Sequence, residues 1–233
     1  MKIEHTANGI LLSLEAVPLP DKLLDPIRER WYIEDDDEDF AEMIEKASRI
    51  SNACAYLRAE QVTSVEGDCV TLGDTSFVSA LVAEKLCTPG MTAVGYVATC
   101  GQALYQARAD YEGDSIAVFI WDQICENYLR MARDMLQTYV TEHYFPSVDN
   151  KKMFAHLSPG SLEAWPISAQ KDLFAFLGDG VPLTGVKLTD SMLMLPIKSS
   201  SGIFFPTETP YENCMHCPRI SCPGRRAPYA AEM

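Results

Sequence analysis

The sequence lacks several features that mark well-known classes of protein. It contains no run of about 18 uncharged apolar residues, so no membrane span is expected. Its first residues, Met1 to His5, hold no basic stretch leading into an apolar run, so we expect no secretory signal and place the protein in the cytoplasm. It also has no internal repeat and no glycine-rich motif of the kind that cradles phosphate groups.

Positive charge is also scarce. The chain holds 19 Lys and Arg residues against 33 Asp and Glu residues, which gives a formal net charge of −14. A surface this acidic repels the phosphate backbone, so nucleic acid is not an expected partner. Part of the excess forms one run, Glu34 to Asp39, which we interpret as a solvated segment that favours the N-terminus of the following helix. The run lacks the alternating ligand spacing of a calcium loop.

Apolar periodicity predicts a mixture of helices and strands. Helices are expected at 21–30, 40–55, 76–86, 102–110, 114–143 and 168–177. Strands are expected at 10–17, 59–65, 69–72, 92–99, 153–157, 186–188, 192–195 and 203–205. The order lacks regular βαβ alternation, so we expect an α+β fold with helices around a twisted, mainly antiparallel sheet. We expect a single domain over residues 1–208, helix-rich to about residue 146 and sheet-rich after it, then a cysteine-rich tail over 209–233.

Eight cysteines are present, and three of them cluster in the tail as Cys214, Cys217 and Cys222. The first two have the Cys-x2-Cys spacing of a metal knuckle, but a fourth ligand is missing from the cluster. We interpret the cluster as a zinc or iron–sulfur site, with a redox thiol group or inert cysteines as the alternatives. The other five cysteines lie in apolar contexts typical of buried thiols: Cys54, Cys69, Cys87, Cys100 and Cys125.

Three further motifs are candidates for chemistry. Ser158-Pro159-Gly160 forms a tight turn in which glycine allows a ligand to approach the backbone closely. The segment from Lys198 to Gly202 offers three hydroxyl groups to an anion. Glu126 lies on the long predicted helix at the i,i+4 spacing that favours an ion pair with Arg130. Each motif also has an ordinary reading, respectively as a turn, a polar loop and a solvated helix face.

Together the motifs resemble the activation domain of cobalamin-dependent methionine synthase, in a free-standing form with a cysteine-rich tail. Residues 188–196 read Leu-Thr-Asp-Ser-Met-Leu-Met-Leu-Pro, similar to the family's Leu-Thr-Glu-Ser-x-x-Met-x-Pro, and Ser201-Gly202-Ile203 follow as its Ser-Gly pair does. The turn from His156 to Ser161 is similar to the family's Arg-x-x-Pro-Gly-Tyr. The likeness covers roughly residues 90–205.

This resemblance implies a methyltransferase-activation component that binds S-adenosylmethionine and assists the reductive methylation of inert cob(II)alamin. A corrinoid-binding methionine synthase or related methyltransferase subunit would supply the cobalamin, and a flavodoxin or ferredoxin would supply the electron. Glu126 would face the amino group of the ligand. The turn that holds its carboxylate would consist of His156, Ser158, Pro159, Gly160 and Ser161.

Two side chains depart from the pattern of the family. His156 replaces the arginine that holds the ligand's carboxylate, and Ser161 replaces a tyrosine. The alternative is therefore a non-catalytic metal or iron–sulfur binding module that kept the fold and lost S-adenosylmethionine binding. A third interpretation is an interaction protein whose tail cysteines are incidental. The chain also lacks the Asp-x-His-x-x-Gly signature that holds cobalamin's lower face, so a partner must bring the corrinoid.

Overall fold

The computed structural model describes residues 1–145, 154–207, 211, 213–221, 225 and 227–230. Within these residues, none of the helices is both long and apolar enough to cross a membrane. The helices, with η for the 3-10 type, are α1 Asp21–Trp31, α2 Glu38–Ile50, α3 Ala80–Lys85, α4 Gln102–Ala107, η1 Arg108–Tyr111, α5 Ser115–Tyr144, η2 Ile167–Ala169, α6 Gln170–Leu177, α7 Gly180–Thr184 and α8 Asn213–His216. The strands are β1 Lys2–His5, β2 Ile10–Glu15, β3 Asn52–Glu66, β4 Cys69–Leu72, β5 Thr75–Val78, β6 Thr92–Thr99, β7 Phe154–Leu157, β8 Lys187–Leu188, β9 Met194–Leu195 and β10 Ser199–Pro206.

An eight-stranded sheet has the order β1-β2-β3-β6-β10-β7, and β4 joins it by pairing with β3 and β5. The pairs β1–β2, β3–β4, β4–β5 and β7–β10 are antiparallel. A separate small sheet consists of β8 and β9. The predicted α+β fold with a mainly antiparallel sheet is confirmed.

The chain divides into two compact units, and each is built from separate stretches of sequence. The first unit comprises Met1–Tyr56, Val97–Gln137 and Gly180–Ser200. The second comprises Leu57–Tyr96, Thr138–Asp179 and Ser201–Met233. The predicted division into one domain and a tail stays a prediction, because its boundary at residues 208 and 209 lies outside the described residues.

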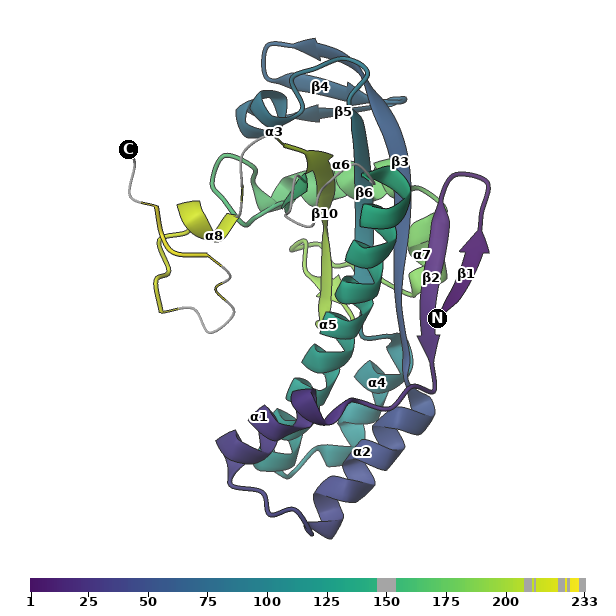
Figure 1. Cartoon of the computed structure of the whole chain (residues 1–233), viewed down its shortest axis with the longest axis vertical. Helices are drawn as coiled ribbons and strands as arrows, with labels where there is room; N and C mark the ends of the chain where they lie inside the picture. The colour runs from purple at the N-terminus through teal and green to yellow at the C-terminus, as the bar shows by residue number, and fades with distance from the viewer. Residues whose placement is uncertain (146–153, 208–210, 212, 222–224, 226, 231–233) are drawn as a thin grey trace. The chain divides into compact units, whose positions relative to one another are not determined.

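In the first unit, α1, α2 and α4 gather beside the first part of α5 (Figure 1). Polar atoms on α5 fasten it to its neighbours. Trp121 donates its indole N–H to the carbonyl oxygen of Leu104 on α4 at 2.9 Å, and the Asn127 amide donates to the carbonyl of Leu23 on α1 at 2.8 Å. Both donors lie on buried residues, so these bonds satisfy polar groups that would otherwise be costly to bury.

The acidic run lies at the N-terminus of α2, as the sequence predicts. Asp37 accepts a hydrogen bond from the backbone N–H of Phe40 at 2.8 Å, which caps the helix. Glu38 and Asp39 occupy the first turn, where the helix dipole favours negative charge. The run therefore serves to start a helix.

Two glycines in the first unit allow close approaches that no side chain would permit. A Cβ on Gly101, whose φ is +98°, would come 2.1 Å from Oδ1 of Asn52. A Cβ on Gly180 would come 1.9 Å from the ring of Tyr56. The first residues of β3 can therefore lie directly against Gly101, the N-cap residue of α4, and against α7.

In the second unit, α3 and α6 pack on the ribbon formed by β3, β4 and β5. Phe77 of β5 and Phe176 of α6 meet edge to face, with ring centroids 5.9 Å apart. Arg58 of β3 donates to the carbonyl oxygen of Phe176 at 2.7 Å and to the Glu60 carboxylate at 3.0 Å. This arginine thereby binds one of the carbonyl groups that a helix C-terminus leaves without an intrahelical partner.

Two predicted helices differ by several residues from those observed. The helix predicted over 40–55 ends at Ile50, because β3 begins at Asn52 with a run of buried residues that helical periodicity cannot distinguish from a buried helix. The helix predicted over 76–86 is replaced at its start by β5. Ser79 then caps α3 by accepting from the N–H of Val82 at 3.3 Å.

The five scattered cysteines were all expected to be buried, and this is only partly correct. Cys54, Cys100 and Cys125 are buried. Cys69 is half-buried, and Cys87 is exposed. Because α3 ends at Lys85, Cys87 lies in the turn beyond the helix, not on its apolar face.

Candidate functional site

Glu126 lies on α5 in the first unit and pairs with Lys198, with their charged atoms 3.5 Å apart. The i,i+4 pair predicted with Arg130 is therefore replaced by a long-range pair. A backbone hydrogen bond holds Lys198 in position: its carbonyl oxygen accepts the N–H of Cys100, just after the end of β6, at 3.0 Å. The side chains of Glu126 and Lys198 are 39% and 32% exposed, so both can reach a ligand.

A hollow of about 410 Å³, which we call the α5 pocket, opens at this ion pair. Its lining consists of Arg30, Trp31, Phe119, Asp122, Gln123, Glu126 and Lys198. The rings of Trp31 and Phe119 are stacked, with centroids 6.0 Å apart and planes at 17°. Trp31 donates its indole N–H to Oε1 of Gln123 at 3.1 Å, which fixes the orientation of the indole. The pocket thus joins an aromatic wall to a pair of opposite charges.

The remaining charges of the α5 pocket are unevenly engaged. Asp122 forms an ion pair with Arg108 at 2.9 Å, and this hydrogen bond raises the pKa of the Arg108 guanidinium. Arg30 lies over the ring of Trp31, 5.9 Å from its centroid. The pocket therefore combines hydrogen-bonding and ionic groups of both signs beside an apolar face, a composition suited to binding a small polar aromatic molecule.

His156 lies in the second unit, on β7. It is paired across the ladder with Phe204 of β10, and the two rings are 5.8 Å apart. β10 lies close to the end of β7: a Cβ on Gly202 would come 2.3 Å from the carbonyl oxygen of Leu157. The glycine of the family-like Ser-Gly pair therefore has a packing role.

The turn after β7 uses its own backbone donors. Gly160 has a φ of +79°, and its N–H donates to the carbonyl of Trp165 at 2.8 Å. The N–H of Ser161 donates to the carbonyl of Ser158 at 3.2 Å. Pro159 is buried, whereas Gly160 and Ser161 are exposed. Side chains, rather than these two amide groups, therefore form the surface that the turn offers to a ligand.

Glu126 belongs to the first unit and the turn from His156 to Ser161 belongs to the second. The sequence predicts that they hold two ends of one ligand. That joint role stays a prediction.

The segment that carries the strongest family resemblance is scaffold. Leu188 and Met194 pair in the β8–β9 hairpin. Thr189 holds the turn between them: its Oγ1 accepts the N–H of Leu193 at 3.1 Å and lies 3.0 Å from the hydroxyl of Ser191. The peptide bond before Pro196 is cis, and β10 follows.

The stretch from Lys198 to Gly202 has two interpretations, an anion site or a polar loop leading into a strand. The loop is wrong, since β10 begins at Ser199, and the anion site stays a prediction. The hydroxyl of Ser199 lies 2.9 Å from that of Thr99 and 2.7 Å from the carbonyl of Pro196. Its hydrogen-bonding capacity is thus used inside the fold.

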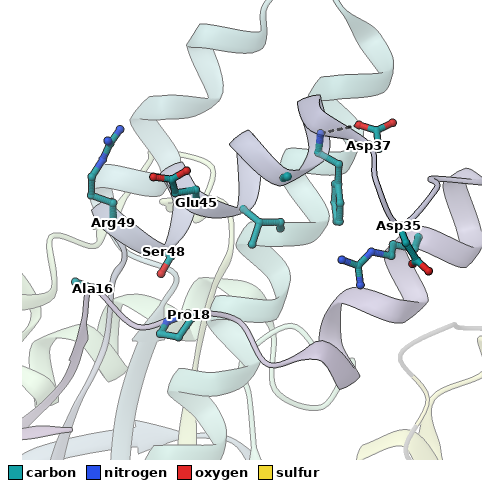
Figure 2. Close-up of a pocket in the computed structure, with 11 residues that line it drawn as sticks. Ala16, Pro18, Asp35, Asp37, Glu45, Ser48 and Arg49 are labelled. Atoms are coloured by element: carbon teal, nitrogen blue, oxygen red, sulfur yellow. Dashed lines mark hydrogen bonds between the residues drawn. The ribbon is translucent and has the colours of Figure 1, made fainter.

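A second hollow, of about 480 Å³, lies along α2 in the first unit (Figure 2). Its lining is mainly Ala16, Pro18, Arg28, Asp35, Asp37, Phe40, Ala41, Ile44, Glu45, Ser48 and Arg49. One wall is fixed by Ser51, which accepts the N–H of Val17 on its hydroxyl at 2.9 Å and the N–H of Ala16 on its carbonyl at 2.9 Å. The carboxylate of Asp37 at one end is already engaged as the cap of α2 (Figure 2).

The cysteine-rich tail is organised by an arginine that the sequence analysis did not single out. The guanidinium of Arg225 donates to backbone carbonyls of Cys214, Cys217, Arg219, Ile220 and Ala227. Cys222, the third predicted ligand, lies outside the described residues. Among those that are described, no three His, Cys, Asp or Glu side chains come together as a metal site.

Sequence reasoning missed most of the α5 pocket. Ile116 and Phe119 lie off the buried stripe of α5 and are 59% and 57% exposed. Large apolar residues out of register on an amphipathic helix are a usable signal for a binding surface. The pairing of Trp31 with Phe119, and of Lys198 with Glu126, joins distant parts of the chain and leaves no trace in local periodicity.

Comparison with known proteins gives a likeness in structure and none in sequence. No protein-family model matches the chain, and no curated protein matches it in sequence. Among solved structures, the chain is similar to the MetH reactivation domain bound to AdoHcy (S-adenosylhomocysteine), with a TM-score of 0.68 and 15% sequence identity. The match covers 90% of this chain and 82% of that one. The chain therefore has the fold of a methionine synthase reactivation domain.

Proposed function

We propose that this chain is an accessory protein for the reductive reactivation of a cobalamin-dependent methionine synthase or a related corrinoid methyltransferase. The observation that carries the proposal is the likeness, over 90% of the chain, to a reactivation domain that was solved with AdoHcy bound. AdoHcy is the product left when S-adenosylmethionine gives up its methyl group. The chain would bind this methyl donor, and a partner would bring the corrinoid.

The proposed reaction has two steps, a one-electron reduction and a methyl transfer. One electron from a flavodoxin- or ferredoxin-type donor would reduce cob(II)alamin on the partner. The reduced corrinoid would then take the methyl group of S-adenosylmethionine, which would form methylcobalamin and release AdoHcy. The protein's contribution is to hold the methyl donor in line with the cobalt, an effect of proximity and orientation.

Two groups of side chains support a binding role. Glu126 presents a half-exposed carboxylate at the α5 pocket, suited to the ammonium group of the donor. The turn formed by residues 156–161 carries an imidazole and two hydroxyl groups on a backbone held by hydrogen bonds.

The test is a reactivation assay. A cobalamin-dependent methionine synthase that lacks its own activation domain is loaded with cob(II)alamin and mixed with S-adenosylmethionine and a chemical reductant. The visible spectrum should change to that of methylcobalamin, with AdoHcy formed in equal amount, much faster when this chain is added. Equal rates with and without the chain would refute the proposal.

A second candidate function, a metal or iron–sulfur module, is favoured by one observation. Arg225 binds the carbonyls of Cys214 and Cys217 and so holds a Cys-x2-Cys loop in a defined shape. Purification without oxygen followed by iron, sulfide and zinc analysis tests this. A stoichiometric metal content that Cys217→Ser removes, and that Cys87→Ser leaves intact, supports the module. A metal-free preparation eliminates it.

A further inference from the structure

We propose that the α5 pocket alone recognises both the amino-acid head group and the adenine ring of the ligand. Glu126 binds the ammonium group, Lys198 binds the carboxylate, and the Trp31–Phe119 pair stacks against the ring. The inference rests on the proposed function and assigns the residues that set its ligand specificity. In this assignment Lys198, and not His156, binds the carboxylate of the ligand.

The charges in the pocket match a zwitterion. An α-amino acid carries an ammonium group and a carboxylate on one carbon atom, and Glu126 and Lys198 present the complementary charges 3.5 Å apart. This separation is longer than that of a good charge-assisted hydrogen bond, so the pair is loose. An amino-acid head group that binds beside this pair gives each charge a second opposite neighbour: its ammonium group for Glu126 and its carboxylate for Lys198.

Lys198 is the better placed of the two cations that line the α5 pocket. Its backbone is anchored to Cys100, and its ammonium group already lies beside Glu126. Arg30 is in the last turn of α1 and rests over the indole of Trp31. Arg108 is engaged by Asp122. Lys198 is thus the cation that lies beside Glu126, and Glu126 is the residue that would bind the ammonium group of the ligand.

The aromatic wall is built for a flat partner. Phe119 is 57% exposed although it is stacked on Trp31, so one aromatic surface stays open. The bond from Trp31 to Gln123 holds the indole in place before any ligand arrives. Nucleobases bind such preformed surfaces by stacking. The volume of about 410 Å³ is in the usual range for a small-molecule pocket.

The experiment compares two probes by calorimetric titration. AdoHcy has both the head group and the adenine, whereas 5′-methylthioadenosine has the adenine and the thioether without the amino acid. Lys198→Met should weaken AdoHcy binding about tenfold or more and leave methylthioadenosine binding unchanged. Phe119→Leu should weaken both probes about tenfold. The matched controls are Lys187→Met, at an exposed lysine outside the pocket, and Ile116→Ala, at an exposed apolar residue of the same helix.

Each outcome decides a different claim. If the wild-type chain binds AdoHcy and both pocket variants bind it equally well, the assignment is wrong and the proposed function survives. If Arg30→Met or His156→Ala loses AdoHcy while Lys198→Met does not, the carboxylate contact lies elsewhere and the assignment is again overturned. If the wild-type chain does not bind AdoHcy, the proposed function itself fails. Circular dichroism spectra of all variants should match that of the wild type, as a check that each variant is folded.

Discussion

At the scale of single residues, Asp37 has a structural role that its neighbours in the acidic run do not share, because its carboxylate caps α2. Asp37→Ala should lower the free energy of unfolding by about 1 kcal/mol, because the N–H of Phe40 loses its acceptor. Asp37→Asn should retain most of the stability, since asparagine caps equally well. Asp36→Ala is the control and should change stability by less than about 0.5 kcal/mol in urea unfolding. Equal losses in Asp36→Ala and Asp37→Ala would show that the cap contributes nothing.

Gly101 gives a second test at this scale. Gly67 and Gly101 both have positive φ, but a Cβ on Gly67 would meet nothing within 4 Å, whereas one on Gly101 would strike Asn52. Gly67→Ala should therefore cost only the backbone strain, about 1–2 kcal/mol. Gly101→Ala should cost more than about 3 kcal/mol, because the start of β3 must also move. Equal losses in thermal or urea unfolding would mean that β3 and the start of α4 are not held as closely as described.

At the scale of elements, α5 is joined to the chain between β2 and α1 through Tyr128. Its hydroxyl donates to the carbonyl oxygen of Val17 at 2.8 Å, and burial raises its pKa from 10.0 to about 12. In the unfolded chain the phenol ionises first, so the folded state binds more protons between these two values. Stability must therefore fall as the pH rises through this window.

The measurement is the urea midpoint at about pH 9 and about pH 11 for the wild type, Tyr128→Phe and Tyr32→Phe. Tyr32 is 93% exposed and serves as the control. The fall in stability between the two pH values should be smaller in Tyr128→Phe than in the wild type, and unchanged in Tyr32→Phe. An identical fall in all three proteins would mean that the Tyr128 phenol is not desolvated.

Elements with a strong periodic pattern were predictable, and those without one were not. β6 was predicted over its observed residues, and α5 to within one residue at each end, because each carries an unbroken apolar pattern. β1 is exposed along its whole length and α7 is one short turn, so neither has a pattern to detect. The same limit applies to the site. Glu126 was identifiable on a helix face, whereas its partner Lys198 depends on how β10 returns to the sheet.

At the scale of the whole molecule, the fold is that of a reactivation domain, and the function proposed for it requires that the chain binds a methyl donor. A ligand that binds only the folded chain stabilises it by about 2.7 kcal/mol at a concentration of 100 times Kd. AdoHcy should therefore raise the thermal midpoint of the wild-type chain, and Glu126→Gln should reduce that shift. Adenosine, which lacks the amino-acid head, should give a smaller shift at the same concentration.

The most direct test of the central claim is a calorimetric titration of the full chain with S-adenosylmethionine, with Glu126→Gln titrated in parallel. The account predicts saturable binding of one ligand per chain, weakened about tenfold or more in the variant because the ammonium group loses its counter-charge. No saturable binding by the wild-type chain would contradict the account, and would leave a protein that has the fold of a reactivation domain without its ligand.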